Sequence, residues 1–139
     1  MINGVLNVYK EKGYTSHDVV AKLRGILRQK KIGHTGTLDP EAEGVLPVCL
    51  GKATKLCELL TDKTKTYEAV LRFGIVTDTQ DMTGKVLEEH PVSVTDEEVE
   101  RTILSFLGEQ EQIPPMYSAL KVNGRKLYEL AREGKEVER

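Results

Sequence analysis

Apolar residues in this chain come in short runs, and their spacing changes repeatedly between the two-residue period of strands and the 3.6-residue period of helices. Residues 44–50 and 66–74 predict strands, whereas residues 17–28 and 95–107 carry apolar side chains at helical spacing. Because the two kinds of element do not alternate strictly, a doubly wound parallel sheet is disfavoured. The sequence predicts an α+β fold with a mixed, mainly antiparallel sheet and flanking helices.

The remaining elements are short and are bounded by turn residues. Thr95 and Glu98 form a capping box, in which each side chain bonds to the backbone N–H of the other residue. Residues 32–40 predict neither helix nor strand, and the last residues, 135–139, resemble the start of another strand. We further expect strands over 2–8, 85–89 and 117–122. Short helices are expected over 52–60, with Leu56, Leu59 and Leu60 facing inward, and over 126–133, with Leu127 and Leu130 facing inward.

Length and composition restrict the class of protein. A chain of 139 residues is the size of one domain, and 39% hydrophobic with 30% charged residues is typical of a globular protein. No apolar run approaches the ~18 residues of a membrane span, and the N-terminus lacks the pattern of a signal peptide. We therefore expect a cytoplasmic protein without a membrane partner, in which Cys49 and Cys57 are small buried side chains and not a disulfide or metal pair.

Charge is distributed unevenly along the chain. The net charge is −2, but residues 1–65 carry 11 basic and 7 acidic side chains, and residues 66–139 carry 9 basic and 15 acidic ones. A mildly basic N-terminal half favours a polyanionic partner, although charged surfaces are most often simply solvated.

Residues 33–40, Gly-His-Thr-Gly-Thr-Leu-Asp-Pro, concentrate the residue types that active sites use. Glycines permit close approach of a ligand to the backbone, and Pro40 restricts the backbone of Asp39. A phosphate loop is disfavoured because no Gly-Lys-Ser/Thr follows, and one His with one Asp is too few for a metal site. Two interpretations remain: a catalytic carboxylate at Asp39 in a polyanion groove with His34 beside it, or a surface loop with an Asx turn.

This segment, with Gly-Val-Leu-Pro at 44–47, resembles the catalytic motif of the TruB family of pseudouridine synthases. Four more segments resemble motifs of that family in the same order, so the similarity extends over nearly the whole chain. They are Lys10 with Gly13 and Thr15-Ser16, Lys65-Thr66-Tyr67, residues 77–84 with Asp81, and residues 113–128. The first of them departs from the family pattern, because Glu11 follows Lys10 where the family has proline.

The resemblance implies a function. Residues 1–139 would be the N-terminal portion of the catalytic domain, with an RNA-gripping thumb segment near 113–134. The activity would convert uridine-55 in the T-loop of tRNA to pseudouridine, with the T-arm as partner and no cofactor, metal or protein partner required. Asp39 would be the catalytic carboxylate. Attack at C1′, attack at C6 and a glycal route all remain open.

The resemblance also implies roles for other side chains. His34 would fill the space left by the flipped uridine, and Tyr67 would stack on the target base, although a strand tyrosine is otherwise usually half-buried core. Asp81 would pair with a basic residue, or else be only a turn residue. Lys10 would support the first motif or contact phosphate, with a solvated side chain as the alternative. Three thumb residues would contact RNA phosphates: Lys121, Arg125 and Lys126.

Members of the family continue well beyond the thumb, with more strands and usually a C-terminal RNA-binding domain, and neither follows Arg139. We therefore expect an incomplete sheet with an exposed edge that favours self-association, and little or no synthase activity from these 139 residues alone. The competing function is a non-catalytic RNA-binding module. A small-molecule hydrolase using Asp39 is a weaker third possibility, because no partner base is evident.

Overall fold

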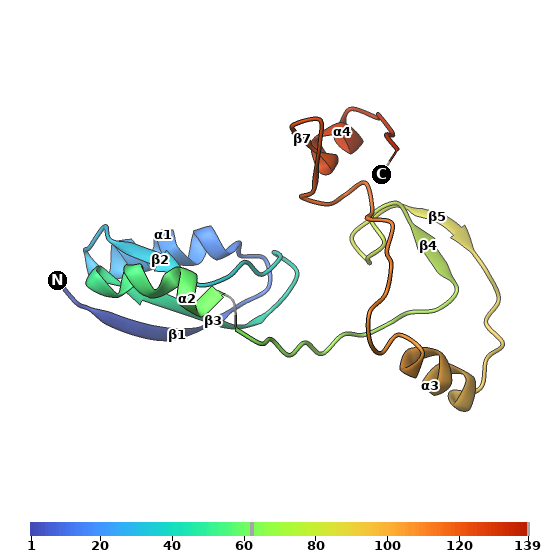
Figure 1. Ribbon diagram of the computed structural model, residues 1–139, viewed down its shortest axis with the longest axis horizontal. Coiled ribbons are helices and arrows are strands. Elements are labelled where there is room, and N and C mark those ends of the chain that lie inside the picture. Colours follow the sequence, from blue (N-terminus) through green and yellow to red (C-terminus); the bar gives the residue numbers. More distant parts are fainter. Residues whose placement is uncertain (62, 139) are drawn as a thin grey trace. The chain divides into compact units, whose positions relative to one another are not determined.

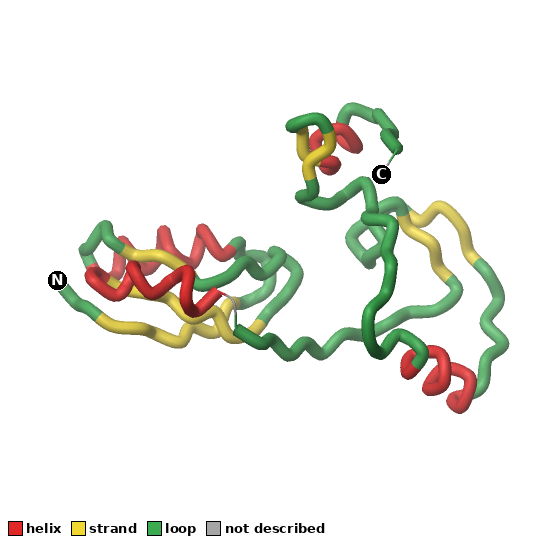
Figure 2. Tube along the Cα trace, in the orientation of Figure 1, coloured by secondary structure: helices red, strands yellow, loops and turns green. Residues whose placement is uncertain are grey.

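The computed structural model describes residues 1–61 and 63–138. They belong to two compact units, Met1–Glu68 and Ala69–Arg139, each with its own secondary structure (Figures 1 and 2). All strand pairings in the described residues are antiparallel, and helices accompany them, which confirms the predicted α+β class. No helix within these ranges combines the length and the apolar composition that crossing a membrane requires.

The N-terminal unit is built on a three-stranded sheet in the order β1-β3-β2 (Figure 1). Strand β1 (Gly4–Lys10) pairs with β3 (Gly44–Leu50) over its whole length, and β2 (Ile32–His34) pairs with the other edge of β3. The expected strand over 44–50 is confirmed. The expected loop over 32–40 is wrong at its first three residues, which form β2, because the free edge of β3 offers partners for their backbone groups.

Helix α1 (Ser16–Leu27) lies against one face of this sheet. Its N-terminus has a capping box in which Thr15 Oγ1 accepts from the Asp18 N–H and the Asp18 carboxylate accepts from the Thr15 N–H. The helix predicted over 17–28 is therefore confirmed. Its inward side chains and those of the sheet form the buried core, which consists of Val19, Val20, Ile32, Leu46, Val48 and Leu50.

The segment after β3 differs from the single helix expected over 52–60. It begins as a 3-10 helix, η1 (Gly51–Leu56), and continues as α2 (Cys57–Thr61). The prediction that Leu56 and Leu59 face inward is wrong, since both side chains are exposed. The less exposed positions of this segment are Gly51, Ala53, Thr54, Cys57 and Leu60.

The strand predicted over 66–74 is not formed, and Figure 2 draws this stretch as loop. Within the described residues no strand pairs with it, so its backbone groups lack the ladder partners that define a strand. Its alternating side chains, among them Tyr67 and Leu71, are consequently exposed. The next strand, β4 (Ile75–Thr77), begins directly afterwards and pairs with β5 (Val86–Glu89).

The C-terminal unit continues with α3 (Asp96–Leu104), which has the predicted capping box between Thr95 and Glu98. The strand expected over 117–122 is reduced to β6 (Lys121–Val122), which pairs with β7 (Arg125–Lys126). Asn123 and Gly124, both with positive φ, form the tight turn between the two strands, and the pairing stops where α4 begins at Leu127. Helix α4 (Leu127–Arg132) buries Leu127 and Leu130 as predicted, whereas residues 135–138 form no strand.

Candidate catalytic loop and nucleic-acid contacts

The loop that carries Asp39 runs between β2 and β3, and hydrogen bonds hold it to three other elements. The Thr35 N–H and hydroxyl both donate to the Pro47 carbonyl, at 3.1 and 3.2 Å. The Leu38 N–H donates to the buried Ser16 hydroxyl at 3.0 Å. These bonds connect the loop to β3 and to the start of α1, so the backbone on the N-terminal side of Asp39 is held by two regular elements.

Lys10, at the end of β1, provides the third hydrogen-bonded connection to the loop. Its side chain is fully buried, and its ammonium donates to the carbonyls of Glu11 (3.0 Å), Tyr14 (2.6 Å) and Pro40 (3.3 Å). The Pro40 carbonyl also accepts from the Gly13 N–H at 2.8 Å. A solvated Lys10 is thereby excluded, and the three carbonyls match the three donors that an ammonium has.

Asp39 itself is exposed, between residues whose backbones are anchored. In the described parts of the chain its carboxylate accepts no hydrogen bond, and only its carbonyl is used, by the Ala42 N–H at 3.0 Å. The Asx turn considered as the alternative therefore does not form there. The loop presents an unpaired carboxylate from a backbone with little freedom to move.

His34 ends β2 and borders a cavity of about 520 Å³ along the outer edge of that strand. The ring of His17 on α1 meets the His34 ring edge-on, with centroids 5.2 Å apart and planes 74° apart. Among the described residues, the His34 Nδ1 is buried and has no hydrogen-bond partner. The lining includes two imidazoles and three basic side chains: His17, His34, Arg24, Lys30 and Lys31.

Asp39 is not among the lining residues of this cavity. The sequence reasoning overlooked His17 and Arg24, which come to the same cavity as His34. The available signal was their spacing, because residues seven apart lie two turns apart on one face of a helix.

Cys57, which lines the cavity, contacts the buried Cys49. Burial, followed by the contact with Cys57, raises the pKa of the Cys49 thiol to about 11. Gly33 lies opposite Cys49 in the sheet, and a Cβ at Gly33 would be 3.1 Å from the Cys57 sulfur. The small residue at position 33 thus lets the helical segment approach the sheet. Both thiols are free, and Cys49 is buried as expected, whereas Cys57 is partly exposed.

Tyr67 lies in the irregular stretch after α2, with 66% of its surface exposed. Within residues 1–61 and 63–138 its ring makes no aromatic or hydrogen-bonded contact, so the structure leaves it unattached to the Asp39 loop. The alternative of a half-buried core tyrosine is not supported either, because the expected strand that would have held it is absent.

Asp81 belongs to the C-terminal unit, in the loop between β4 and β5. Its Oδ1 accepts from the Thr79 hydroxyl (2.7 Å) and from the Thr83 N–H and hydroxyl (2.8 and 2.5 Å). Hydrogen bonds from Thr83, then Thr79, lower the pKa of the Asp81 carboxyl. The charged form is therefore stabilised inside its own turn, to which the backbone N–H of Gly84 also contributes.

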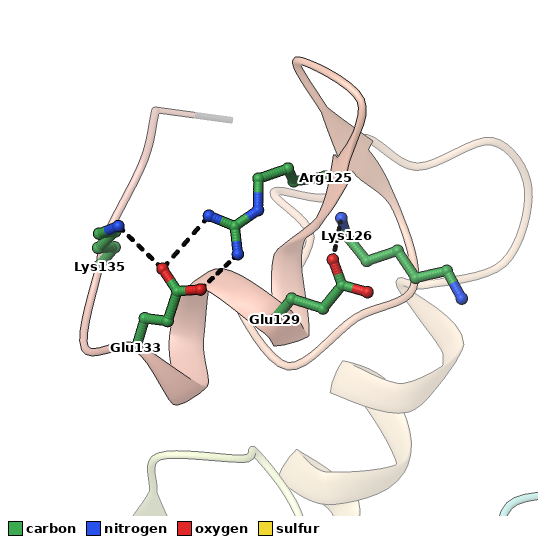
Figure 3. Close-up of polar contacts among 5 residues, drawn as sticks. All are labelled: Arg125, Lys126, Glu129, Glu133 and Lys135. Carbon is green, nitrogen blue, oxygen red and sulfur yellow. Dashed lines mark hydrogen bonds and ion pairs between the residues drawn. The ribbon is translucent and has the colours of Figure 1, made fainter.

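The three expected RNA contacts lie on the β6–β7 hairpin, where they separate onto two faces. Lys121 lies opposite Lys126, and Arg125 lies opposite Val122, so the lysines share one face of the ladder and Arg125 is on the other. The Lys126 ammonium donates to the Tyr128 hydroxyl at 3.3 Å and lies 5.3 Å from that ring's centroid. Arg125 pairs with Glu133 (Figure 3).

Comparison with known proteins identifies the family. The sequence pattern described as TruB family pseudouridylate synthase (N terminal domain) matches residues 24–139, which is most of the chain. The chain therefore belongs to the TruB family, as the motifs predicted.

Individual relatives agree with this assignment. The chain is 70% identical over 138 residues to the tRNA pseudouridine synthase B of Lachnoclostridium phytofermentans, covering 99% of the chain and 45% of the relative. It is 57% identical over 141 residues to the Bacillus subtilis protein of the same name, covering 100% of the chain and 46% of the relative. A solved Cbf5-Nop10-Gar1 complex contains a chain of similar structure, with a TM-score of 0.57 and 31% sequence identity. The match covers 85% of this chain and 31% of that chain. The chain thus spans about half the length of the curated relatives that it matches.

Proposed function

We propose that this chain is part of a tRNA pseudouridine synthase that isomerises uridine-55 of the T-loop, with Asp39 as the catalytic carboxylate. One observation carries the proposal: an unpaired carboxylate stands on a loop anchored by β1, α1 and β3, in the motif that resembles the family's catalytic one. Relatives that match the whole chain are named tRNA pseudouridine synthase B, which supports tRNA as the substrate.

The chemistry is an isomerisation without net oxidation or hydrolysis. The bond between uracil N1 and ribose C1′ breaks, the base turns, and a bond from C5 to C1′ forms. C5 then loses its proton and N1 gains one, so the atoms balance without a cofactor. A carboxylate serves this reaction by attacking C1′ or C6, or by taking the proton that leads to a glycal, and all three uses need an ionised, correctly placed Asp39.

The remaining residues support this step in our proposal. Lys10 fixes the loop through Pro40 and acts as a positioning residue, since its donors already face carbonyls. His34 occupies the place of the flipped uridine, and Tyr67 stacks on the target base once RNA orders its segment. Asp81 offers its second oxygen to a basic residue. Lys121, Arg125 and Lys126 face RNA phosphates.

Replacement of Asp39 by asparagine tests the proposal, because it removes the charge and keeps the shape. We expect Asp39→Asn to lower tritium release from C5-labelled uridine in a T-arm RNA by at least about a hundredfold, with RNA affinity nearly unchanged. The measurement uses the whole protein encoded by the reading frame to which these residues belong. Glu41→Gln is the matched control, since it neutralises an exposed carboxylate of the same loop, paired with Lys12 at 2.8 Å.

The competing function, a non-catalytic RNA-binding module, predicts a different result. Under it the Asp39→Asn and Glu41→Gln proteins behave alike, and no tritium is released by the unmodified protein. Full turnover by the Asp39→Asn protein contradicts our proposal, whatever its RNA affinity. Full turnover by the 139 residues alone contradicts only the expectation that this portion is inactive by itself.

A further inference from the structure

Glu133, at the C-terminal end of α4, pairs with both Arg125 and Lys135 (Figure 3). Its carboxylate accepts from both terminal nitrogens of Arg125, one bond being 3.2 Å and the other shorter, and from the Lys135 ammonium at 2.8 Å. The three side chains remain between 43% and 61% exposed, so solvent and ligands reach them. Arg125 and Lys135 thus form a site for one anion, which the Glu133 carboxylate occupies.

The geometry of Arg125 and Lys135 determines which anions this site can bind. A guanidinium presents paired N–H groups that match carboxylate and phosphate oxygens equally well, and an ammonium adds a point charge. Exposed ion pairs contribute little to stability, so an external anion displaces the carboxylate at small cost. The side-chain bond from Arg125, followed by that from Lys135, lowers the pKa of the Glu133 carboxyl to about 2. Glu133 is therefore ionised at neutral pH and competes with any anion that approaches.

We infer that Arg125 and Lys135 form a phosphodiester-binding site on the α4 side of the hairpin, which Glu133 occupies in the free protein and leaves when RNA binds. This inference rests on the proposed function, because it takes RNA as the polyanion. It adds Lys135 to the RNA contacts and assigns Glu133 the role of an internal competitor. Lys121 and Lys126, on the other face of the hairpin, have no such carboxylate on their ammonium groups in the described residues.

The test measures RNA affinity, because an internal competitor lowers affinity and its removal raises it. We expect Glu133→Gln to bind a T-arm hairpin RNA several-fold more tightly than the unmodified chain, in fluorescence anisotropy at fixed salt. The dependence of affinity on salt should steepen by about one phosphate contact. Glu109→Gln is the charge-matched control, an exposed residue of the same unit in an irregular stretch. It reports the general effect of removing one negative charge.

A second comparison separates competition for Arg125 from general electrostatics. In an Arg125→Gln background the gain from Glu133→Gln should fall toward that of Glu109→Gln, since the site has lost its main donor. Lys135→Gln alone should weaken binding, and far-UV circular dichroism checks that all variants keep their helices.

The inference is overturned if the Glu133→Gln protein binds RNA no more tightly than the Glu109→Gln protein. It is also overturned if the gain in RNA affinity persists in the Arg125→Gln background, or if neither the unmodified chain nor its variants bind the RNA. These outcomes are independent of turnover by Asp39. The proposed function fails when Asp39→Asn retains turnover, and the present inference fails when RNA binds without coupling between Arg125 and Glu133.

Discussion

At the scale of single residues, two buried polar side chains hold the backbone on either side of Asp39. Ser16 accepts from the Leu38 N–H, and Lys10 donates to the Pro40 carbonyl. Both side chains are buried, and the three donors of Lys10 already face carbonyls, so each side chain acts through the loop. Motif comparison alone could not separate this positioning role from direct contact with RNA, because both roles need the same polar residues.

Replacing Ser16 by alanine should loosen the loop without removing Asp39. The Leu38 N–H would then lose its acceptor, and an unsatisfied buried donor costs about 1–3 kcal/mol. We expect urea unfolding to register a loss of that size, and hydrogen exchange of the Leu38 amide to accelerate. Ser93→Ala, at an exposed irregular position, should change neither quantity. An unchanged Leu38 amide in the Ser16→Ala protein would show that the serine does not hold the loop.

At the scale of elements, the two capped helices differ in what stabilises them. Helix α1 has its capping box and also buries Val19 and Val20 against the sheet. Helix α3 has an equivalent capping box, but none of its residues is buried, and its apolar side chains such as Ile103 are exposed. Local hydrogen bonds therefore account for a much larger share of the stability of α3.

The cap of α3 can be tested by Thr95→Ala. Loss of an N-cap side chain costs about 1 kcal/mol of helix stability, and α3 has no buried residue to compensate. Amide hydrogen exchange over α3 should accelerate several-fold, with α1 unaffected. Thr102→Ala is the control, since its hydroxyl bonds only to the Glu98 carbonyl within the helix and alanine favours helix. Equal exchange in both variants would contradict the role of the cap.

At the scale of the whole molecule, the chain consists of two compact units, Met1–Glu68 and Ala69–Arg139. The proposed catalytic carboxylate belongs to the first unit, and the hairpin with the proposed RNA contacts belongs to the second. From residue 63 to residue 74 the chain forms no helix or strand. The segment with the alternating strand pattern is thus the one that joins the units.

Limited proteolysis should reveal this joining segment. Trypsin needs an exposed, unpaired stretch of backbone, and Lys63, Lys65 and Arg72 lie in one. We expect the first cleavage there, measured by mass spectrometry, with a resistant fragment that contains the β1-β3-β2 sheet. The basic residues of α1, such as Arg24, serve as the internal comparison because they lie in a capped, packed helix. First cleavage within α1 would contradict the division into units.

The sequence by itself determined the elements whose signals are local. The helices with capping boxes, the strand over 44–50, the α+β class and the family all follow from residues close together in the chain, because caps, turns and periodicity act over a few residues. The choice of Asp39 as the catalytic carboxylate rests on motif resemblance and stays a prediction.

Only the tertiary structure decided the features that depend on distant partners. Residues 66–74 have the alternation of a strand but no partner, so their pattern does not become a strand, whereas Ile32–His34 becomes one because β3 offers a free edge. The burial of Lys10, the basic cavity shared by His17 and His34, and the capture of Arg125 by Glu133 likewise join residues from different elements. Hydrogen-bond partners brought together by folding, and not residue type, determine which of these side chains are free to meet a ligand.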